Sequence, residues 1–197
     1  MSVDTCNVLL VIGSLHKNSV TRIVIKQLAK NLSMDACKVN TLDFLEKPMP
    51  LFNPDTVYHQ DYYALLRKKV TSADVIVLGS PDYHGSMSSV MKNFLDHFWK
   101  EFSGKLFATL VASHEKGLTV HDQLRTVARQ CYAWAMPYGM SFHESEDIKN
   151  GKIIEESLRE RLEMFQRDIR VYGQLLARQR EADLSGNNPG FMSHYRK

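Results

Sequence analysis

Three polar segments of the chain carry the side chains that are best suited to bind a ligand. The first, Gly13–Arg22, brings three hydroxyl groups and a histidine together directly after a run of aliphatic residues. If a helix begins here, its first-turn N–H groups lack intrahelical partners and lie at the positive end of the helix dipole, which suits a phosphate. A serine or asparagine at this place equally suits a helix N-cap without any ligand. The candidate phosphate-binding residues are Ser14, His16, Ser19, Val20 and Thr21.

The second segment, Gly79–Ser88, also follows an aliphatic run and has residue types that suit a flat ring. Pro81 restricts the backbone, Gly85 allows a close approach or a positive φ, and Tyr83 offers an aromatic face. We expect main-chain N–H groups of residues 83–86 to donate to the edge of such a ring. A plain connecting loop that ends in a helix cap is the alternative. The candidates here are Pro81, Asp82, Tyr83, His84, Gly85 and Ser86.

The third segment, Ser113–Gly117, follows another apolar run. In an open α/β sheet the carboxyl ends of the parallel strands meet at one edge, where ligands bind. The three segments therefore meet at this edge, with the first suited to a phosphate and the other two to the sides of a flat slot. This combination describes a site for flavin mononucleotide (FMN). The candidates in the third segment are Ser113, His114, Lys116 and Gly117, of which Lys116 equally suits a solvated position.

Several other kinds of site have no counterpart in the sequence. It contains neither GxxxxGK(S/T) nor GxGxxG, which bind phosphates in nucleoside triphosphatases and in dinucleotide-binding folds. Its eight histidines form no HxxxH or HExxH pair, so no metal site is expected. No Ser-His-Asp arrangement or pair of carboxylates stands out as catalytic. A formal charge of +3 gives no reason to expect a nucleic-acid partner.

The order of the apolar runs predicts the scaffold that positions these segments. Continuous runs rich in Val, Ile and Leu are typical of strands buried on both faces of a parallel sheet, and amphipathic helical patterns alternate with them. The expected fold is α/β: a flavodoxin-like, doubly wound, five-stranded parallel sheet in the order 2-1-3-4-5, with helices on both faces. The predicted strands are Val8–Gly13, Cys37–Phe44, Val75–Gly79, Lys105–Ala112 and Gly139–His143, and the predicted helices are Ser19–Leu32, Tyr58–Val70, Val90–Phe102, Val120–Ala135 and Ile153–Arg180.

Length and composition indicate one ordinary globular domain, because the chain has 197 residues, of which 44% are hydrophobic and 24% charged. We expect a single domain over residues 1–181 and a loop-like tail over residues 182–197. The three cysteines are far apart and form no CxxC pattern, so free buried thiols in a reducing compartment are expected. The longest early apolar run, Val8–Ile12, is too short for a signal or membrane span, which favours a cytoplasmic protein.

The first two segments resemble two motifs of the NAD(P)H-dependent FMN reductase family, which also contains quinone, azo-dye and chromate reductases. The family's first loop is similar to G-S-x-R-x-x-S-x-N. Its second motif is similar to P-E-Y-N-G-S, followed by L-K-N and an aspartate. The matching residues are Gly13, Ser14, Ser19 and Thr21, with His16 where arginine is usual, and then Pro81-Asp82-Tyr83-His84-Gly85-Ser86, Met91-Lys92-Asn93 and Asp96. The third segment keeps a single glycine where the family's loop is usually rich in glycine.

The resemblance implies an enzyme that binds FMN and uses NADPH or NADH as co-substrate. Hydride would pass from the nicotinamide to flavin N5, and a small electron acceptor such as a flavin or quinone would then take the electrons in the same slot. No protein side chain is expected to act as a catalytic acid or base. A flavodoxin-type FMN electron carrier without direct NAD(P)H oxidation is the alternative. A receiver-type signalling domain shares the fold but needs acidic residues where Gly13 and Ser14 stand.

The resemblance also implies a homodimer or homotetramer, and the terminal helix gives an independent reason to expect one. At 1.5 Å per residue this helix would extend roughly 40 Å, which is longer than a domain of this size readily covers. Tyr172, Leu175 and Leu176 would then lie beyond the sheet as an exposed apolar stripe. The second candidate for a subunit contact, or else part of the core, is the group Phe98, Trp99 and Phe102.

Overall fold

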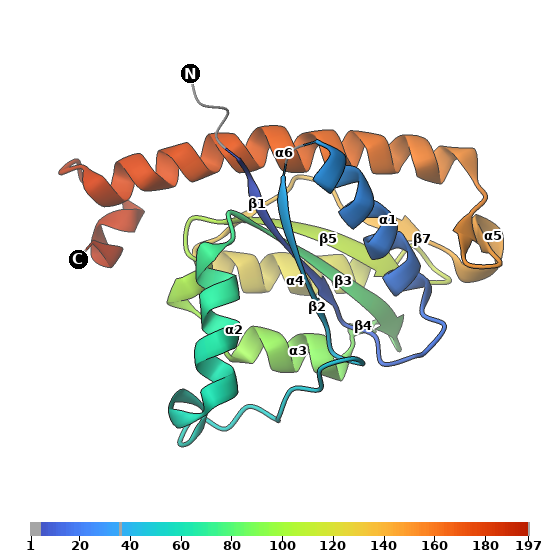
Figure 1. The fold of residues 1–197 in the computed structure, drawn as a ribbon, viewed down its shortest axis with the longest axis horizontal. Helices are drawn as coiled ribbons and strands as arrows, with labels where there is room; N and C mark the ends of the chain where they lie inside the picture. Colours follow the sequence, from blue (N-terminus) through green and yellow to red (C-terminus); the bar gives the residue numbers. More distant parts are fainter. Residues whose placement is uncertain (1–4, 36, 197) are drawn as a thin grey trace.

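A computed structural model describes residues 5–35 and 37–196 as a central sheet with helices on both faces (Figure 1). Five strands of the sheet run parallel in the order β2-β1-β3-β5-β6. The short strand β7 pairs with β5 as well. Counted along the parallel sheet, this is the predicted order 2-1-3-4-5. The bounds are β1 (Asn7–Ile12), β2 (Lys38–Asp43), β3 (Val75–Tyr83), β5 (Leu106–Ala112), β6 (Trp134–Ala135) and β7 (Met140–Phe142).

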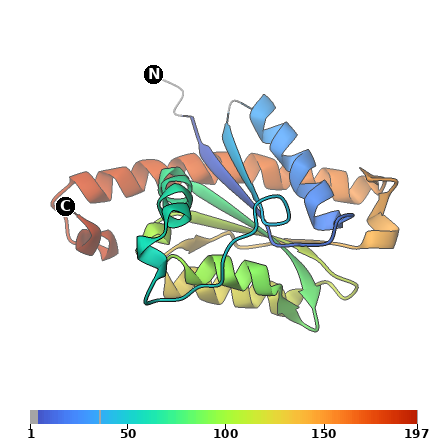
Figure 2. The same cartoon turned by 60° about the horizontal axis from the view of Figure 1, so that its bottom comes forward.

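The alternation of side chains along the strands divides the core into two layers. In β1, the side chains of Val8, Leu10 and Ile12 belong to one apolar cluster and those of Leu9 and Val11 to another. Because successive side chains of a strand point to opposite faces, an uninterrupted apolar run must be covered on both sides. Figure 2 shows the sheet between the two helical layers. One layer holds α1 (Val20–Met34) and α6 (Glu156–Ser185), and the other holds α2 (Asp61–Ser72), α3 (Ser89–Asp96) and α4 (Leu118–Gln130).

The fifth position of the sheet is divided between two strands, where the sequence predicted one. β6 pairs with the start of β5 and β7 with its end. Between them lies Pro137, which has no N–H to give to a neighbouring strand. The helix predicted to reach Ala135 ends at Gln130, because Tyr132 adopts a φ of 56° and the Ala133 N–H turns back to the Ala128 carbonyl at 2.9 Å.

The helix predicted to reach Phe102 also ends earlier, because α3 gives way to a 3-10 turn, η2 (Lys100–Phe102). Phe98 lies 5.6 Å from Phe94, and Phe102 lies 5.0 Å from Phe107, measured between ring centroids. Both side chains are buried in the core. Of the three aromatic residues considered either for a subunit contact or for the core, Phe98 and Phe102 belong to the core and only Trp99 is exposed.

The central strand β3 continues past the predicted end at Gly79 and turns back as β4 (Ser86–Met87). Tyr83 pairs with Ser86 in antiparallel fashion. His84 and Gly85 form the turn with φ values of 58° and 73°, which is the two-residue turn with two positive φ angles that suits a hairpin. The second polar segment is therefore a hairpin rooted in the central strand and not an open loop.

The terminal helix α6 contains 30 residues, which corresponds to about 45 Å. Its buried residues all precede residue 174, and its end extends beyond the sheet (Figure 1). Tyr172 and Leu175 are exposed as expected, whereas Leu176 is partly buried against the core. The division expected at residue 181 falls inside this helix.

The tail is more ordered than the predicted loop. It returns as a 3-10 turn, η3 (Phe191–Tyr195), in which Met192 is buried. The Phe191 ring stacks on Tyr132 at 6.4 Å between centroids, and Arg196 Nε donates to the Asp183 carbonyl at 2.8 Å. These contacts join residues too distant in sequence for a local pattern to predict.

The remaining short elements are η1 (Val57–His59), α5 (Glu144–Asp147), β8 (Ile148–Lys149) and β9 (Lys152–Ile153). All three cysteines are buried and free, as predicted. Across the described part of the chain, no helix combines the length and apolar character that crossing a membrane requires.

Candidate functional site

The first polar segment leads from β1 into α1 at the carboxyl edge of the sheet. Ser19 is the N-cap of α1, and its Oγ accepts the Arg22 N–H at 3.3 Å, which leaves the serine hydroxyl proton available to a ligand. Thr21, in the first turn, is 1% exposed. Its hydroxyl has no hydrogen-bond partner within residues 5–35 and 37–196. A buried hydroxyl without a partner is costly, and a ligand oxygen would satisfy it.

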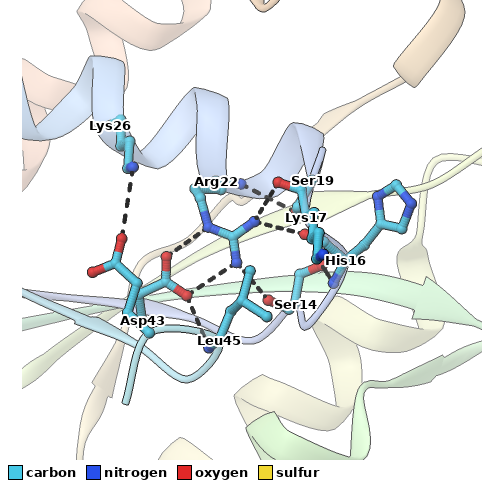
Figure 3. Close-up of polar contacts among 9 residues, drawn as sticks. Ser14, His16, Lys17, Ser19, Arg22, Lys26, Asp43 and Leu45 are labelled. Atoms are coloured by element: carbon cyan, nitrogen blue, oxygen red, sulfur yellow. Dashed lines mark hydrogen bonds and ion pairs between the residues drawn. The ribbon is translucent and has the colours of Figure 1, made fainter. Parts of the chain in front are cut away.

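Arg22 holds the backbone of this loop through hydrogen bonds (Figure 3). Its guanidinium donates to both carboxylate oxygens of Asp43, at 2.5 and 3.0 Å, which links α1 to the end of β2. It also donates to the backbone carbonyls of Ser14, His16 and Lys17, at 2.9, 2.6 and 3.2 Å. Three carbonyl oxygens that would repel an anion are therefore turned towards a cation.

The Arg22–Asp43 pair is buried, with side chains 9% and 5% exposed. Burial alone would raise the pKa of Asp43. The hydrogen bonds from Arg22 and from the Leu45 N–H, together with the positive charge of Arg22, nevertheless hold that pKa below its usual value. The hydrogen bond to Asp43 raises the pKa of Arg22. Both groups are therefore ionised, and the charge of Asp43 is neutralised beside the loop.

Asp82 connects the second and third segments. One of its carboxylate oxygens accepts the Gly85 N–H at 2.8 Å, and the other accepts the Ser113 hydroxyl at 2.9 Å. The N–H of Gly85 is thus already used inside the hairpin, although the sequence suggested that it would be free for a ligand. Tyr83 is 52% exposed at the tip of β3, as expected for a residue that offers a ring face.

Ser86 contacts α4 and lines neither of the cavities described below. Its hydroxyl donates to the Gln123 side chain on α4 at 3.1 Å, and its backbone pairs with Tyr83.

The third segment is a tight turn between β5 and α4. Ser113 donates its backbone N–H to the Phe142 carbonyl at 3.1 Å, and the Glu115 N–H donates to the Ser113 hydroxyl at 3.0 Å. Lys116 and Gly117 have φ values of 60° and 59°. A Cβ at Gly117 would lie 2.4 Å from Val111 Cγ1, so a larger residue does not fit this turn without a shift.

His114 joins this turn to the segment that follows β7. Its Nδ1 lies 2.7 Å from His143 Nε2, and the Ser145 N–H donates to His143 Nδ1 at 3.3 Å. Since a backbone N–H can only donate, neutral His143 carries its proton on Nε2 and gives it to His114. The turn is therefore held both by His143, through His114, and by Asp82, through Ser113.

The three segments enclose two adjoining cavities at the carboxyl edge of the sheet. The first cavity, about 260 Å³, touches all three segments, and the second, about 440 Å³, lies between the second and third. Asp82, Ser113 and His114 line both. The first cavity is lined by Ser14, His16, Asn18, Ser19, Val20, Thr21, Pro81, Asp82, Tyr83, Ala112, Ser113, His114 and Glu144. The second is lined by Asp82, His84, Gly85, Ser113, His114, Glu115, Gly117, Leu118 and Thr119.

Most of the residues selected from the sequence thus meet in these cavities, and two do not line them. Lys116 lines a third hollow of about 850 Å³ beside α4, which shares Ser113 and His114 with both cavities, and Ser86 is turned towards Gln123. A further hollow of about 850 Å³ lies at the amino edge of the sheet, beside the start of β1 and the end of α6. Ligands of open α/β sheets bind at the carboxyl edge, which excludes the hollow at the amino edge. The two smaller cavities are the candidate site because every selected residue except Lys116 and Ser86 lines one of them.

Arg22, Asp43 and Glu144 also lie at the first segment or the first cavity, and they were not predicted from the sequence. Arg22 sits among apolar residues on the buried stripe of its helix, and Asp43 ends a strand, so two opposite charges at inward positions were the available signal. Glu144 is exposed at the rim of the first cavity and had no signal. Within the residues that the structure describes, no group of three or more His, Cys, Asp or Glu side chains is placed to hold a metal ion.

Comparison with known proteins finds relatives of similar sequence and of similar fold. An FMN-dependent NADPH-azoreductase from Staphylococcus aureus is 27% identical over 150 residues, which covers 72% of this chain and 79% of that protein. The solved structure of an NADH:FMN oxidoreductase shares the fold with a TM-score of 0.71, 15% identity, and coverage of 85% of this chain and 90% of that one. An NAD(P)H:(acceptor) oxidoreductase from Paracoccus denitrificans also gives 0.71, with 17% identity and coverage of 86% and 98%.

A family model described as NADPH-dependent FMN reductase matches residues 6–147, which contain β1, the three polar segments and β7. The matched stretch includes every residue that the sequence selected for the site. The chain therefore belongs to the NADPH-dependent FMN reductase family of flavin-dependent oxidoreductases.

Proposed function

We propose that the two cavities hold FMN, with its phosphate at the first segment and its ring between the second and third. The observation that carries this proposal is Thr21, whose buried hydroxyl has no partner in the described structure and lines the first cavity. The Ser19 hydroxyl and the first-turn amides of α1 stand beside it. Phosphate oxygens accept hydrogen bonds from such groups and are attracted by the positive end of the helix dipole.

The electrostatics of the first segment support the same placement. Arg22 neutralises Asp43 and binds three loop carbonyls, so this side of the cavity repels an anion less than it would without Arg22. The carboxylate of Glu144 opposes an anion, but it is exposed at the rim, where water screens its charge. The residues present therefore fit a phosphate group.

The second cavity supports the placement of the flavin ring. It lies between the His84–Gly85 turn and the turn that ends at Gly117, and both turns have positive φ angles that bring the backbone close to the cavity. When bound, FMN supplies the redox chemistry, namely hydride acceptance from NADPH or NADH and electron transfer to an acceptor. The half-exposed ring of Tyr83 at the rim offers area on which a nicotinamide or a planar acceptor can stack.

We infer that the electron acceptor is a small planar compound such as an azo dye, a quinone or a free flavin. The azoreductase relatives support this class, and the open rim beside Tyr83 is compatible with it. The three free, buried cysteines fit a reducing compartment, so we also place the protein in the cytoplasm.

The experiment that tests the proposed function is extraction of the bound flavin from the purified protein, followed by anaerobic addition of NADPH or NADH. We expect FMN rather than FAD, bleaching of its visible absorbance by at least one nicotinamide, and ping-pong kinetics with an acceptor. Recovery of FAD, or no affinity for either flavin, contradicts the site. Reduction of the flavin only by a separate protein reductase would instead show an electron carrier.

We further propose that the protein is a homodimer or homotetramer, and the exposed side chains of Tyr172 and Leu175 on α6 and of Trp99 support this. Large apolar groups exposed together on one helix are typical of an interface. Light scattering at micromolar concentration is the test. A monomer with full reductase activity would contradict this proposal.

A further inference from the structure

A chain of hydrogen bonds runs from the sheet to the third segment through a buried histidine. His121 on α4 is 4% exposed. Its Nδ1 lies 2.7 Å from the Thr109 hydroxyl on β5, and its Nε2 lies 3.0 Å from the Ser141 hydroxyl on β7. The Ser141 hydroxyl in turn donates to the backbone carbonyl of Lys116. This chain thus connects β5, α4 and β7 to the Lys116 peptide group.

The direction of every hydrogen bond in this chain can be assigned. A carbonyl oxygen only accepts, so Ser141 spends its single proton on Lys116 and must accept from His121 Nε2–H. The lone pair of Nδ1 then accepts the Thr109 proton. Neutral His121 with its proton on Nε2 satisfies each group. Burial, and the nearby charge of Arg125, lower the pKa of His121 to about 4, so the ring is in this neutral form at physiological pH.

The Lys116 peptide is where the turn needs support. Lys116 has a φ of 60°, which is a left-handed conformation. This conformation is unfavourable for any residue that has a Cβ atom, whereas glycine adopts it without that cost. The hydrogen bond from Ser141 fixes the carbonyl of the Lys116 peptide. This peptide group directly precedes Gly117, which is the N-cap of α4. The turn is also fixed at its start by Asp82 and Phe142, so Ser141 holds its other end.

Gly139 makes room for the chain. A Cβ at this position would lie 2.4 Å from the His121 ring and 2.4 Å from the Thr109 hydroxyl. The interruption between β6 and β7 thus brings backbone without a side chain against the imidazole. This close approach leaves the ring little freedom to turn away from Ser141.

We propose that His121 is a positioning residue, which, in its neutral form, orients the Ser141 hydroxyl towards Lys116 and so holds residues 113–117 in the shape that completes the flavin cavities. The proposal rests on the proposed function, because it gives these residues a role in flavin binding. It assigns the role to side chains that lie outside both cavities.

The test compares Ser141→Ala with Ser103→Ala as a matched control. Ser103 is also a serine whose hydroxyl donates to a backbone carbonyl, that of Cys131 at 3.1 Å, but it precedes β5 at the opposite edge of the sheet. In apoprotein, Ser141→Ala should raise the amide hydrogen-exchange rates of residues 114–118 about tenfold, and it should raise the FMN dissociation constant by about the same factor. Ser103→Ala should change neither, whatever its effect on the unfolding midpoint.

Two variants of His121 separate positioning from packing. His121→Gln keeps an N–H that can reach Ser141 and should retain tight FMN binding, whereas His121→Leu removes it and should behave like Ser141→Ala. Unchanged exchange at residues 114–118 in both Ser141→Ala and His121→Leu would overturn the proposal. Faster exchange with an unchanged FMN dissociation constant would overturn the role in flavin binding. If wild-type protein bound no flavin, the proposed function would fail, while the exchange measurement on apoprotein would still decide whether His121 positions the turn.

Discussion

Replacing Asp43 with asparagine should unfold the protein at a much lower urea concentration. The carboxylate makes two contacts with Arg22, at 2.5 and 3.0 Å, and both side chains are less than one tenth exposed. Removing one charge leaves the guanidinium buried without a counter-ion, which typically costs about 3–5 kcal/mol. Arg22 keeps its three carbonyl partners, which partly solvate the cation, so we expect about 3 kcal/mol, the lower end of that range.

The assay is urea unfolding of the apoprotein followed by far-ultraviolet circular dichroism, with the slope of the transition as the check that unfolding stays two-state. The control is Lys92→Met, which breaks the exposed Lys92–Asp96 pair on α3 and should change stability by less than about 0.5 kcal/mol. The double variant Arg22→Met/Asp43→Leu should cost less than the sum of its single changes, since it leaves no unpaired charge.

A cost below about 1 kcal/mol for Asp43→Asn would refute this reasoning, because that value is typical of a surface ion pair. Strict additivity in the double variant would refute it as well. The dissociation constant for FMN provides a second readout, because the same guanidinium turns the carbonyls of Ser14, His16 and Lys17 away from an anion.

Further predictions concern Thr21, Ser19 and Tyr83 at the site and His121 on α4. Thr21→Val should leave the apoprotein as stable or more stable, because it removes a buried hydroxyl without a described partner, but it should weaken FMN binding about tenfold, measured by flavin fluorescence. An unchanged FMN affinity would show that Thr21 is not part of the site. Ser19→Ala should likewise weaken FMN binding by about 1–2 kcal/mol. Tyr83→Ala should lower kcat/KM while changing Tm little, since the ring is half exposed, and a large loss of Tm with unchanged turnover would contradict its place at the rim. His121 has its pKa lowered to about 4 by burial, so the unfolded chain takes up this proton first, and stability should fall by about 3 kcal/mol as the pH drops from about 6.5 towards 4. His121→Gln should flatten that part of the urea-midpoint profile, and an unchanged profile would argue against the neutral ring.

The arrangement of the sheet could be predicted because it depends on local patterns. Val8–Ile12 and Val75–Leu78 are apolar without interruption, which is typical of a strand covered on both faces, and the helices between them are amphipathic. The carboxyl edge then follows from topology, and with it the meeting of the three polar segments.

Other features depend on contacts between residues that are distant in sequence. Nothing local indicates that Tyr132 takes a positive φ and ends α4, or that His84, rather than the more usual asparagine, opens the hairpin turn. Arg22 and Asp43 lie 21 positions apart and are of residue types that usually face water. The chain from Thr109 to Lys116 joins β5, α4 and β7, so it exists only once the fold has formed.

The extension of β3 beyond the sheet limits how the substrate specificity of this enzyme can be altered. Tyr83 and the turn that follows it lie at the end of a nine-residue strand whose first seven residues are buried, so the hairpin is anchored in the core through this strand. Such a support bends little, because moving it would disturb the close packing of Val77 and Leu78 against both helical layers. If the acceptor binds beside Tyr83 as proposed, a different acceptor would be accommodated by exchanging the side chains at the tip, while the distance between the hairpin and the opposite turn stays nearly constant.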